Sequence, residues 1–206
     1  MLDTLHILHL KFTGIEKTDL VCAKRYESLM EELRCQRITD YKIWDGIYNP
    51  DNTKQAIHLG HRQIVQYAKD NNLPRVVISE DDIRFTHPNS YNYFLSQIPE
   101  SYDLFCGLVY SAEMQGDRVM NGASGIMTLF VVNERFYDFF LSMDTNNHVD
   151  REAGLSAFKH EYYVVSEMCV EQRGGYSHNL RYEMFYDTYL EGKKLYTGTN
   201  GVNTNL

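Results

Sequence analysis

Cysteines and long apolar runs are scarce in this sequence, and both absences restrict what the protein can be. The four cysteines stand at positions 22, 35, 106 and 169 and include no CxxC pair. We therefore expect reduced, mostly buried thiols rather than a zinc site or a disulfide-stapled domain. No apolar stretch approaches the roughly 20 residues that span a bilayer. Residues 5–10, interrupted by two histidines, are too short for a signal peptide. These absences predict a cytoplasmic protein without a transmembrane segment.

Positive charge is also in short supply. Lysine and arginine together number 20 against 28 acidic residues, which gives a formal net charge of −8. Because duplex nucleic acid is bound through a positively charged face, nucleic-acid binding is not favoured, although Arg181, Lys193 and Lys194 leave open a local basic groove. The sequence also lacks a phosphate-binding loop of the GxxxxGK type, which argues against a phosphotransferase of that class.

Apolar patterning is well developed. With 206 residues and 43% hydrophobic content, the chain is expected to form one globular domain over residues 1–206, with a polar tail from about residue 192. Strands are predicted over residues 4–12, 40–44 and 76–78, and helices over residues 17–34 and 56–71. This β-α-β-loop-α-β order indicates an α/β fold with a mostly parallel sheet flanked by crossover helices. Further along, the pattern predicts helices over 89–97, 134–143 and 152–159, strands over 102–110, 125–132 and 162–165, and a loop over 111–123.

The most informative stretch is an apolar run, Val76 to Ile78, that ends in Glu80, Asp81 and Asp82. Three adjacent carboxylates at the end of a buried strand repel one another and are costly to desolvate, so a cation is expected to compensate them. Because side chains alternate along a strand, Glu80 and Asp82 should share one face and Asp81 the other. An acid pair of this kind suits Mg²⁺ or Mn²⁺ bridging two phosphates. The alternative is an acidic, solvated loop.

Three other residues could carry chemistry but are weak signals alone. His61 lies on the apolar face of its predicted helix, where a histidine is usually a packed core residue. Asp150 follows a polar loop and could be a general base for an attacking hydroxyl, although such an acid is usually a cap or a surface charge. His178 follows a flexible Gly-Gly turn and could be a third metal ligand, or simply a surface loop residue.

The order of these features resembles glycosyltransferase family 25, the group that holds lipooligosaccharide galactosyltransferases and collagen glycosyltransferases. The resemblance runs from about residue 5 to about residue 180. Its segments are Lys24-Arg25-Tyr26-Glu27, Trp44-Asp45-Gly46, Gly60-His61, Val77 to Asp82, Ser124-Gly125 to Phe140, Val149-Asp150, Gln172 and Ser177-His178. Gly60 stands where the family has serine, and His178 where it has aspartate.

The resemblance implies a single-domain GT-A fold, in which a Rossmann-like sheet binds a nucleotide sugar and a divalent metal at its strand ends. It implies Glu80, Asp82 and His178 as ligands of Mn²⁺ or Mg²⁺, and Asp150 as the catalytic base. Residues implied to face the donor are Arg25, Asp45, His61, Asp81 and Gln172.

The predicted activity is transfer of a hexose from a nucleoside diphosphate sugar, with a UDP-sugar favoured, to a hydroxyl acceptor. The acceptor could be a glycan, a lipooligosaccharide or a hydroxylated side chain. Inversion is expected, because no second carboxylate is evident for a double displacement. Two alternatives stay open: transfer to a hydroxymethylated DNA base, and a non-catalytic GT-A-like module that binds glycans or nucleotides.

Overall fold

The computed structural model describes residues 3–177 and 182–198. A mixed eight-stranded sheet lies at its centre. The strand order is β2-β1-β3-β8-β5-β9-β7-β6. In chain order these strands are β1 (Leu5–His9), β2 (Tyr41–Asp45), β3 (Arg75–Glu80), β5 (Leu104–Cys106), β6 (Ser111–Gln115), β7 (Arg118–Ser124), β8 (Leu129–Asn133) and β9 (Tyr162–Val164). Within this sheet, β8 and β7 run against the other strands. The expected single-domain α/β fold with a mostly parallel sheet is confirmed.

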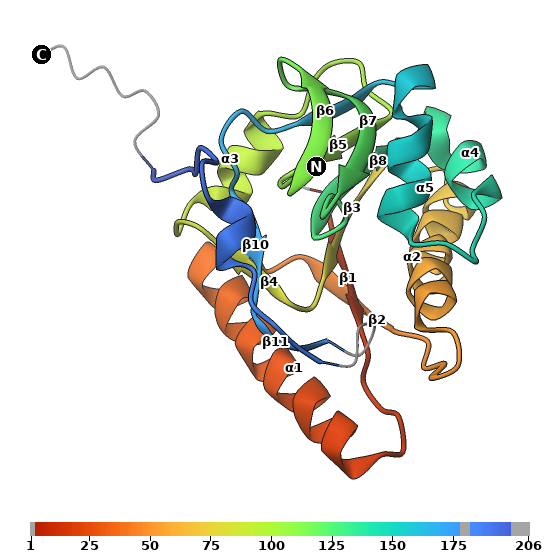
Figure 1. Ribbon diagram of the computed structural model, residues 1–206, viewed down its shortest axis with the longest axis vertical. Helices are drawn as coiled ribbons and strands as arrows, with labels where there is room; N and C mark the ends of the chain where they lie inside the picture. The colour runs from red at the N-terminus through yellow and green to blue at the C-terminus, as the bar shows by residue number, and fades with distance from the viewer. Residues whose placement is uncertain (1–2, 178–181, 199–206) are drawn as a thin grey trace, which may run out of the picture.

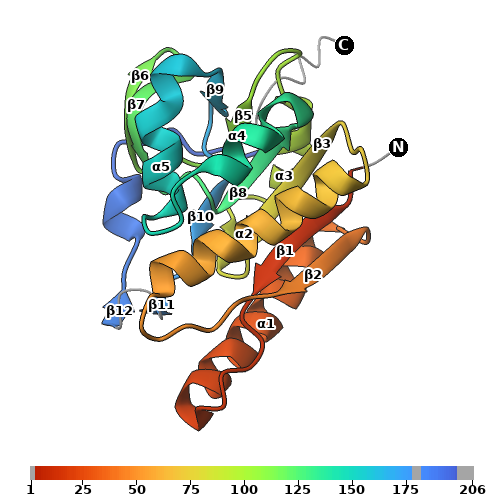
Figure 2. The ribbon, with the colours of Figure 1, turned by 90° about the vertical axis from the view of Figure 1, so that its right-hand side faces the viewer.

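Helices cover both faces of the sheet (Figure 1). One side carries α1 (Glu16–Gln36) and α3 (Ser90–Ser96), and the other carries α2 (Thr53–Asp70), α4 (Tyr137–Ser142) and α5 (Val149–Ser156). Figure 2 shows α2 lying along the sheet with α4 and α5 above it. Short 3-10 turns occupy Glu134–Phe136, Ala157–Lys159 and Asp187–Leu190. No helix in the described ranges combines the length and apolar character that crossing a bilayer demands.

The sheet interior is apolar where the sequence pattern predicted it. Leu5, Ile7 and Leu8 of β1 are buried together with the two histidines of that strand. Val77, Ile78 and Phe130 are fully enclosed where β3 pairs with β8. All four cysteines are free thiols that form no disulfide bond. Those of Cys22, Cys106 and Cys169 are buried, and that of Cys35 is exposed.

The buried face of α1 differs from the predicted one. Apolar residues at positions 20, 23, 26, 30 and 33 recur at helical spacing and predict one inward face. However, Leu20 and Tyr26 are 59% and 40% exposed, and the buried positions include Cys22, Leu29 and Leu33. The first half of α1 extends past the end of the sheet (Figure 1), so its apolar residues have little to pack against there. The helical period was therefore right, but the period alone does not say which stripe meets the core.

The loop predicted over residues 111–123 was wrong, because β6 and β7 form a hairpin there. Gly116 adopts a positive φ of 62° at the turn, a conformation that glycine supplies without steric cost. The residues of β6 are mostly exposed, and Ala112 and Met114 give it only a short and weak apolar alternation. A polar edge hairpin of this kind is hidden from a search for hydrophobic periodicity.

Two features bring distant segments to the carboxyl end of β3. The Glu80 N–H donates to the carbonyl of Thr128, 3.1 Å away, just before β8 begins. The chain then enters β4 (Ile83–Phe85), which pairs antiparallel with β10 (Val170–Gln172) and sets Gln172 opposite Ile83. A second small ribbon joins β11 (Gly175–Ser177) to β12 (Tyr182–Met184). The acidic run therefore lies beside segments from the last quarter of the chain.

Candidate functional site

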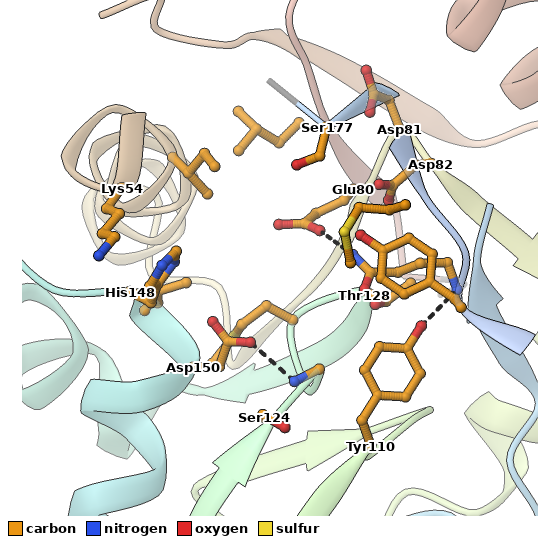
Figure 3. A pocket seen from close by; sticks show the side chains of 18 of the residues that line it. Lys54, Glu80, Asp81, Asp82, Tyr110, Ser124, Thr128, His148, Asp150 and Ser177 are labelled. Carbon is orange, nitrogen blue, oxygen red and sulfur yellow. Dashed lines mark hydrogen bonds between the residues drawn. The ribbon is translucent and has the colours of Figure 1, made fainter. Parts of the chain in front are cut away.

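A cavity of about 460 Å³ opens at the carboxyl end of β3 (Figure 3). Its walls come from the acidic run, the beginnings of α2 and α5, the segment that precedes β8, and the C-terminal segment that carries Met184 and Tyr186. This is the edge of an α/β sheet at which ligands bind, outside the carboxyl ends of the parallel strands.

Asp81 is held in a local charge pair. Its carboxylate accepts a hydrogen bond from Arg25 at 3.1 Å and lies 2.7 Å from Nδ1 of His9. Burial works to raise the pKa of Asp81, but the bond to His9 and the charge of Arg25 outweigh it and lower the pKa below its usual range. Asp81 is thus a stable carboxylate that fixes Arg25 in place. A second nitrogen of Arg25 donates to the carbonyl of Tyr176 at 3.2 Å.

Glu80 and Asp82 are much less well compensated. Oε2 of Glu80 accepts a weak bond from the Gln172 amide at 3.4 Å, and Oδ2 of Asp82 lies 3.6 Å from Arg25. Oδ1 of Asp82 is buried and has no hydrogen-bond partner among the described residues. Burial, partly offset by Arg25, raises the pKa of Asp82 to about 6. Burial and then the charges of Asp82 and Asp150 raise the pKa of Glu80 well above its usual value.

This arrangement fits a divalent cation. Asp81 and Asp82 share the guanidinium of Arg25, and a buried oxygen of Asp82 has no partner among the described residues, so a bound positive charge would relieve both costs. Carboxylate oxygens are also the ligands that Mg²⁺ and Mn²⁺ prefer. No group of three histidine, cysteine or acidic side chains poised for a metal occurs within residues 3–177 and 182–198. The predicted third ligand, His178, lies outside those residues.

Asp150 enters the same cavity from the first turn of α5. Its Oδ2 accepts a hydrogen bond of 3.0 Å from the N–H of Gly125 (Figure 3). Gly125 has a φ of +69°, and a Cβ there would lie 2.2 Å from the ring of Tyr110. Only glycine both adopts this φ freely and leaves room for the Tyr110 ring, so Gly125 presents its N–H to Asp150 without strain. Asp150 is thereby oriented by the backbone.

His61 and Asp45 do not line the cavity. His61 is fully buried behind Glu80, with Nε2 3.6 Å from Oε1 of Glu80, and it packs edge-on against Phe130. Burial lowers its pKa to about 3, so the imidazole is neutral. Asp45 is exposed at the end of β2, although its neighbour Gly46 reaches the cavity wall. The direct donor contacts predicted for these two residues therefore stay predictions.

Sequence reasoning did not single out two other groups in the cavity. One is a set of basic residues, Lys54, His148 and Arg151. The other is a stack of tyrosines, in which the ring of Tyr110 lies 5.7 Å from that of Tyr186 and nearly parallel to it. The available signal was the position of His148 and Arg151 on either side of Asp150. The tyrosines gave no signal, because residues 110 and 186 meet only in the folded chain.

The basic groove considered for nucleic acid gains little support from the described residues. Lys194 pairs with the buried carboxylate of Glu167 at 2.6 Å, and Arg181 lies outside the described residues.

Comparison with known proteins gives information on the fold but not on the family. No family model matches the chain, and no curated protein matches it. Membership of glycosyltransferase family 25 is therefore not supported by a direct sequence match. The inositol-1-phosphate CTP transferase from T. maritima is 9% identical over 79% of this chain and 84% of its own, with a TM-score of 0.52. A197 from STIV is 10% identical over 89% and 94%, with a TM-score of 0.47. A glycosyltransferase involved in glycosylation of the major capsid of PBCV-1 is 14% identical over 79% and 81%, with a TM-score of 0.45. At 9% identity the likeness to the CTP transferase concerns the fold alone, and no inference is based on the other two structures.

Proposed function

We propose that this protein is a metal-dependent glycosyltransferase that moves a hexose from a nucleoside diphosphate sugar to a hydroxyl acceptor. The observation that carries the proposal is the pair of poorly compensated carboxylates, Glu80 and Asp82, in a cavity shared with Asp150. A fold in common with a structure described as a CTP transferase, an enzyme that acts on a nucleotide, supports the same reading.

Glu80 and Asp82 would hold Mn²⁺ or Mg²⁺, with His178 as a candidate third ligand. The bound metal supplies neutralisation of the diphosphate leaving group. Gln172 keeps Glu80 directed along the cavity wall through its amide. Asp81, itself bonded to His9, holds Arg25 at this wall, where its guanidinium would add positive charge beside the leaving group.

Asp150 is the proposed base. The N–H of Gly125 occupies one carboxylate oxygen, and the other makes no hydrogen bond with a described residue. A carboxylate fixed in this way can accept the proton of an acceptor hydroxyl without reorganising. Because Glu80 and Asp82 are committed to the cation, Asp150 is the carboxylate left for the acceptor. A single displacement with inversion follows, and the anomeric proton signal of the first product tests it: a retained anomer would exclude this step.

The experiment that tests the function is a thermal-shift screen of UDP-, GDP- and CMP-sugars with and without Mn²⁺, followed by transfer assays with the donor that stabilises. We expect one nucleotide class to raise the melting temperature only when the metal is present. Glu80→Gln should lose that stabilisation. The matched control is Glu113→Gln, an exposed carboxylate on β6 that does not line the cavity.

Two outcomes would count against the proposal. Metal-dependent nucleotide binding without transfer or hydrolysis would favour a non-catalytic binding module. If the nucleotide and Mn²⁺ stabilise the Glu80→Gln variant as much as the wild type, Glu80 is not a metal ligand.

A further inference from the structure

The cavity has two walls of opposite charge. Lys54, in the first turn of α2, and His148 lie together on one side, whereas Asp81 and Asp82 lie on the other (Figure 3). Arg151 follows Asp150 in the first turn of α5 and also lines the cavity. Burial lowers the pKa of His148, Asp150 acts against this, and the charges of Lys54 and Arg151 lower it further. Lys54 and Arg151 are therefore both close enough to act electrostatically on His148. We call Lys54, His148 and Arg151 the basic corner.

The charges of Lys54 and Arg151 are not neutralised by an ion pair within the part of the protein that the structure describes. Neither Lys54 nor Arg151 forms an ion pair or a side-chain hydrogen bond with a residue in 3–177 or 182–198. Arg25, the other arginine that lines the cavity, is committed to Asp81 and Asp82. In a chain with a net charge of −8, two unpaired cations at one cavity mouth create a local field that attracts an anion.

The position of the basic corner indicates which substrate carries that anion. His148 and Arg151 flank Asp150 in sequence, so the corner is continuous with the proposed base. The donor diphosphate belongs to the opposite wall, where Glu80 and Asp82 would hold the metal. An anion held by the basic corner is therefore beside the hydroxyl that is to be deprotonated.

Resting on the proposed function, we propose that the basic corner binds an anionic group of the acceptor, and that the acceptor is a sugar carrying a phosphate or a carboxylate. Lys54 and Arg151 bind the anion by charge-assisted hydrogen bonds, which are stronger than neutral ones. His148 lines the same cavity. This arrangement fixes the acceptor in the orientation in which its hydroxyl reaches Asp150.

The test is calorimetric titration of glucose 6-phosphate, glucuronate and glucose into the protein in chelator, which needs no turnover. We expect the two anionic sugars to bind more tightly than glucose, and their binding to weaken as salt is raised. The double variant Lys54→Gln/Arg151→Gln should weaken them by at least about tenfold and leave glucose unchanged. The matched control, Lys17→Gln/Lys24→Gln, removes the same charge from exposed positions of α1 and should bind like the wild type.

Three results would overturn the proposal. The first is equal binding of charged and neutral sugars to the wild type. The second is equal binding of glucose 6-phosphate to the double variant and the wild type. The third is a double variant that keeps glucose 6-phosphate but loses stabilisation by the metal and nucleotide, because the corner would then serve the donor diphosphate. If the double variant does not fold, Lys54→Gln alone is titrated and should show part of the loss. Failure of the proposed function appears separately, as absence of metal-dependent nucleotide binding in the wild type.

Discussion

Replacing Asp82 by asparagine is expected to stabilise the metal-free protein at neutral pH and to abolish its response to manganese. Asp82 is 7% exposed, and burial raises its pKa from 3.8 to about 6. A carboxyl group whose pKa is higher in the folded chain favours folding while it is protonated, and that advantage is lost as the pH rises from about 4 through about 6. Above this window the ionised group opposes folding.

The pKa difference sets the size of the effect. A displacement of about two pH units corresponds to about 3 kcal/mol of folding free energy. This is a ceiling, because the new amide must find partners of its own and Arg25 loses one of its two neighbouring acids. We therefore expect Asp82→Asn to gain between about 1 and 3 kcal/mol at pH 7.5 and to match the wild type near pH 4.

Urea unfolding in chelator at several pH values measures this difference, and melting temperatures with Mn²⁺ measure the metal response. Asp51→Asn, a change of the same kind at an exposed loop position outside the cavity, should leave both unchanged. A variant less stable than the wild type at pH 7.5 in chelator would refute the reasoning. So would stabilisation by Mn²⁺ equal to that of the wild type.

Two further predictions concern the proposed base and its support. Asp150→Asn should lower the transfer rate about 10² to 10⁴-fold, as expected for loss of a general base, while thermal shifts with metal and nucleotide stay at wild-type values; loss of both together would indicate a binding role instead. Gly125→Ala should destabilise the fold by about 1 to 3 kcal/mol and slow transfer, because the methyl group meets the Tyr110 ring and the backbone resists a positive φ. Gly116→Ala shares the positive φ but has open space around it, so its melting temperature should fall less and its transfer rate should not change.

The acidic strand end could be located from sequence because all of its signal is local. A β-branched run followed by three acids defines both the strand and the sheet edge, and strand alternation predicts that Asp81 points away from Glu80 and Asp82. The structure differs, because β3 ends at Glu80. Asp81 and Asp82 lie in the turn that follows, where both are near Arg25, so the alternation does not extend to them. The chemical roles of these residues remain predictions.

Other parts of the site depend on contacts that no local pattern records. Lys54 lies at an exposed position of α2, and nothing in its neighbourhood of the sequence distinguishes it from an ordinary surface lysine. His61 was placed among the donor contacts by resemblance, but the fold buries it behind Glu80. Asp150 needed the ordered resemblance, because its distance from Glu80 in sequence hides the fact that both line one cavity.

The pairing of β4 with β10 has a consequence for synthesis of the protein. The acids are synthesised before Gln172 and Tyr186, which lie far downstream in the sequence. Until those residues are added, Glu80 lacks its amide partner and the wall that carries Tyr186 is missing. A nascent or prematurely terminated chain that stops before β10 therefore cannot enclose a ligand. Competence to bind requires synthesis past Tyr186, and products truncated before β10 should be inert.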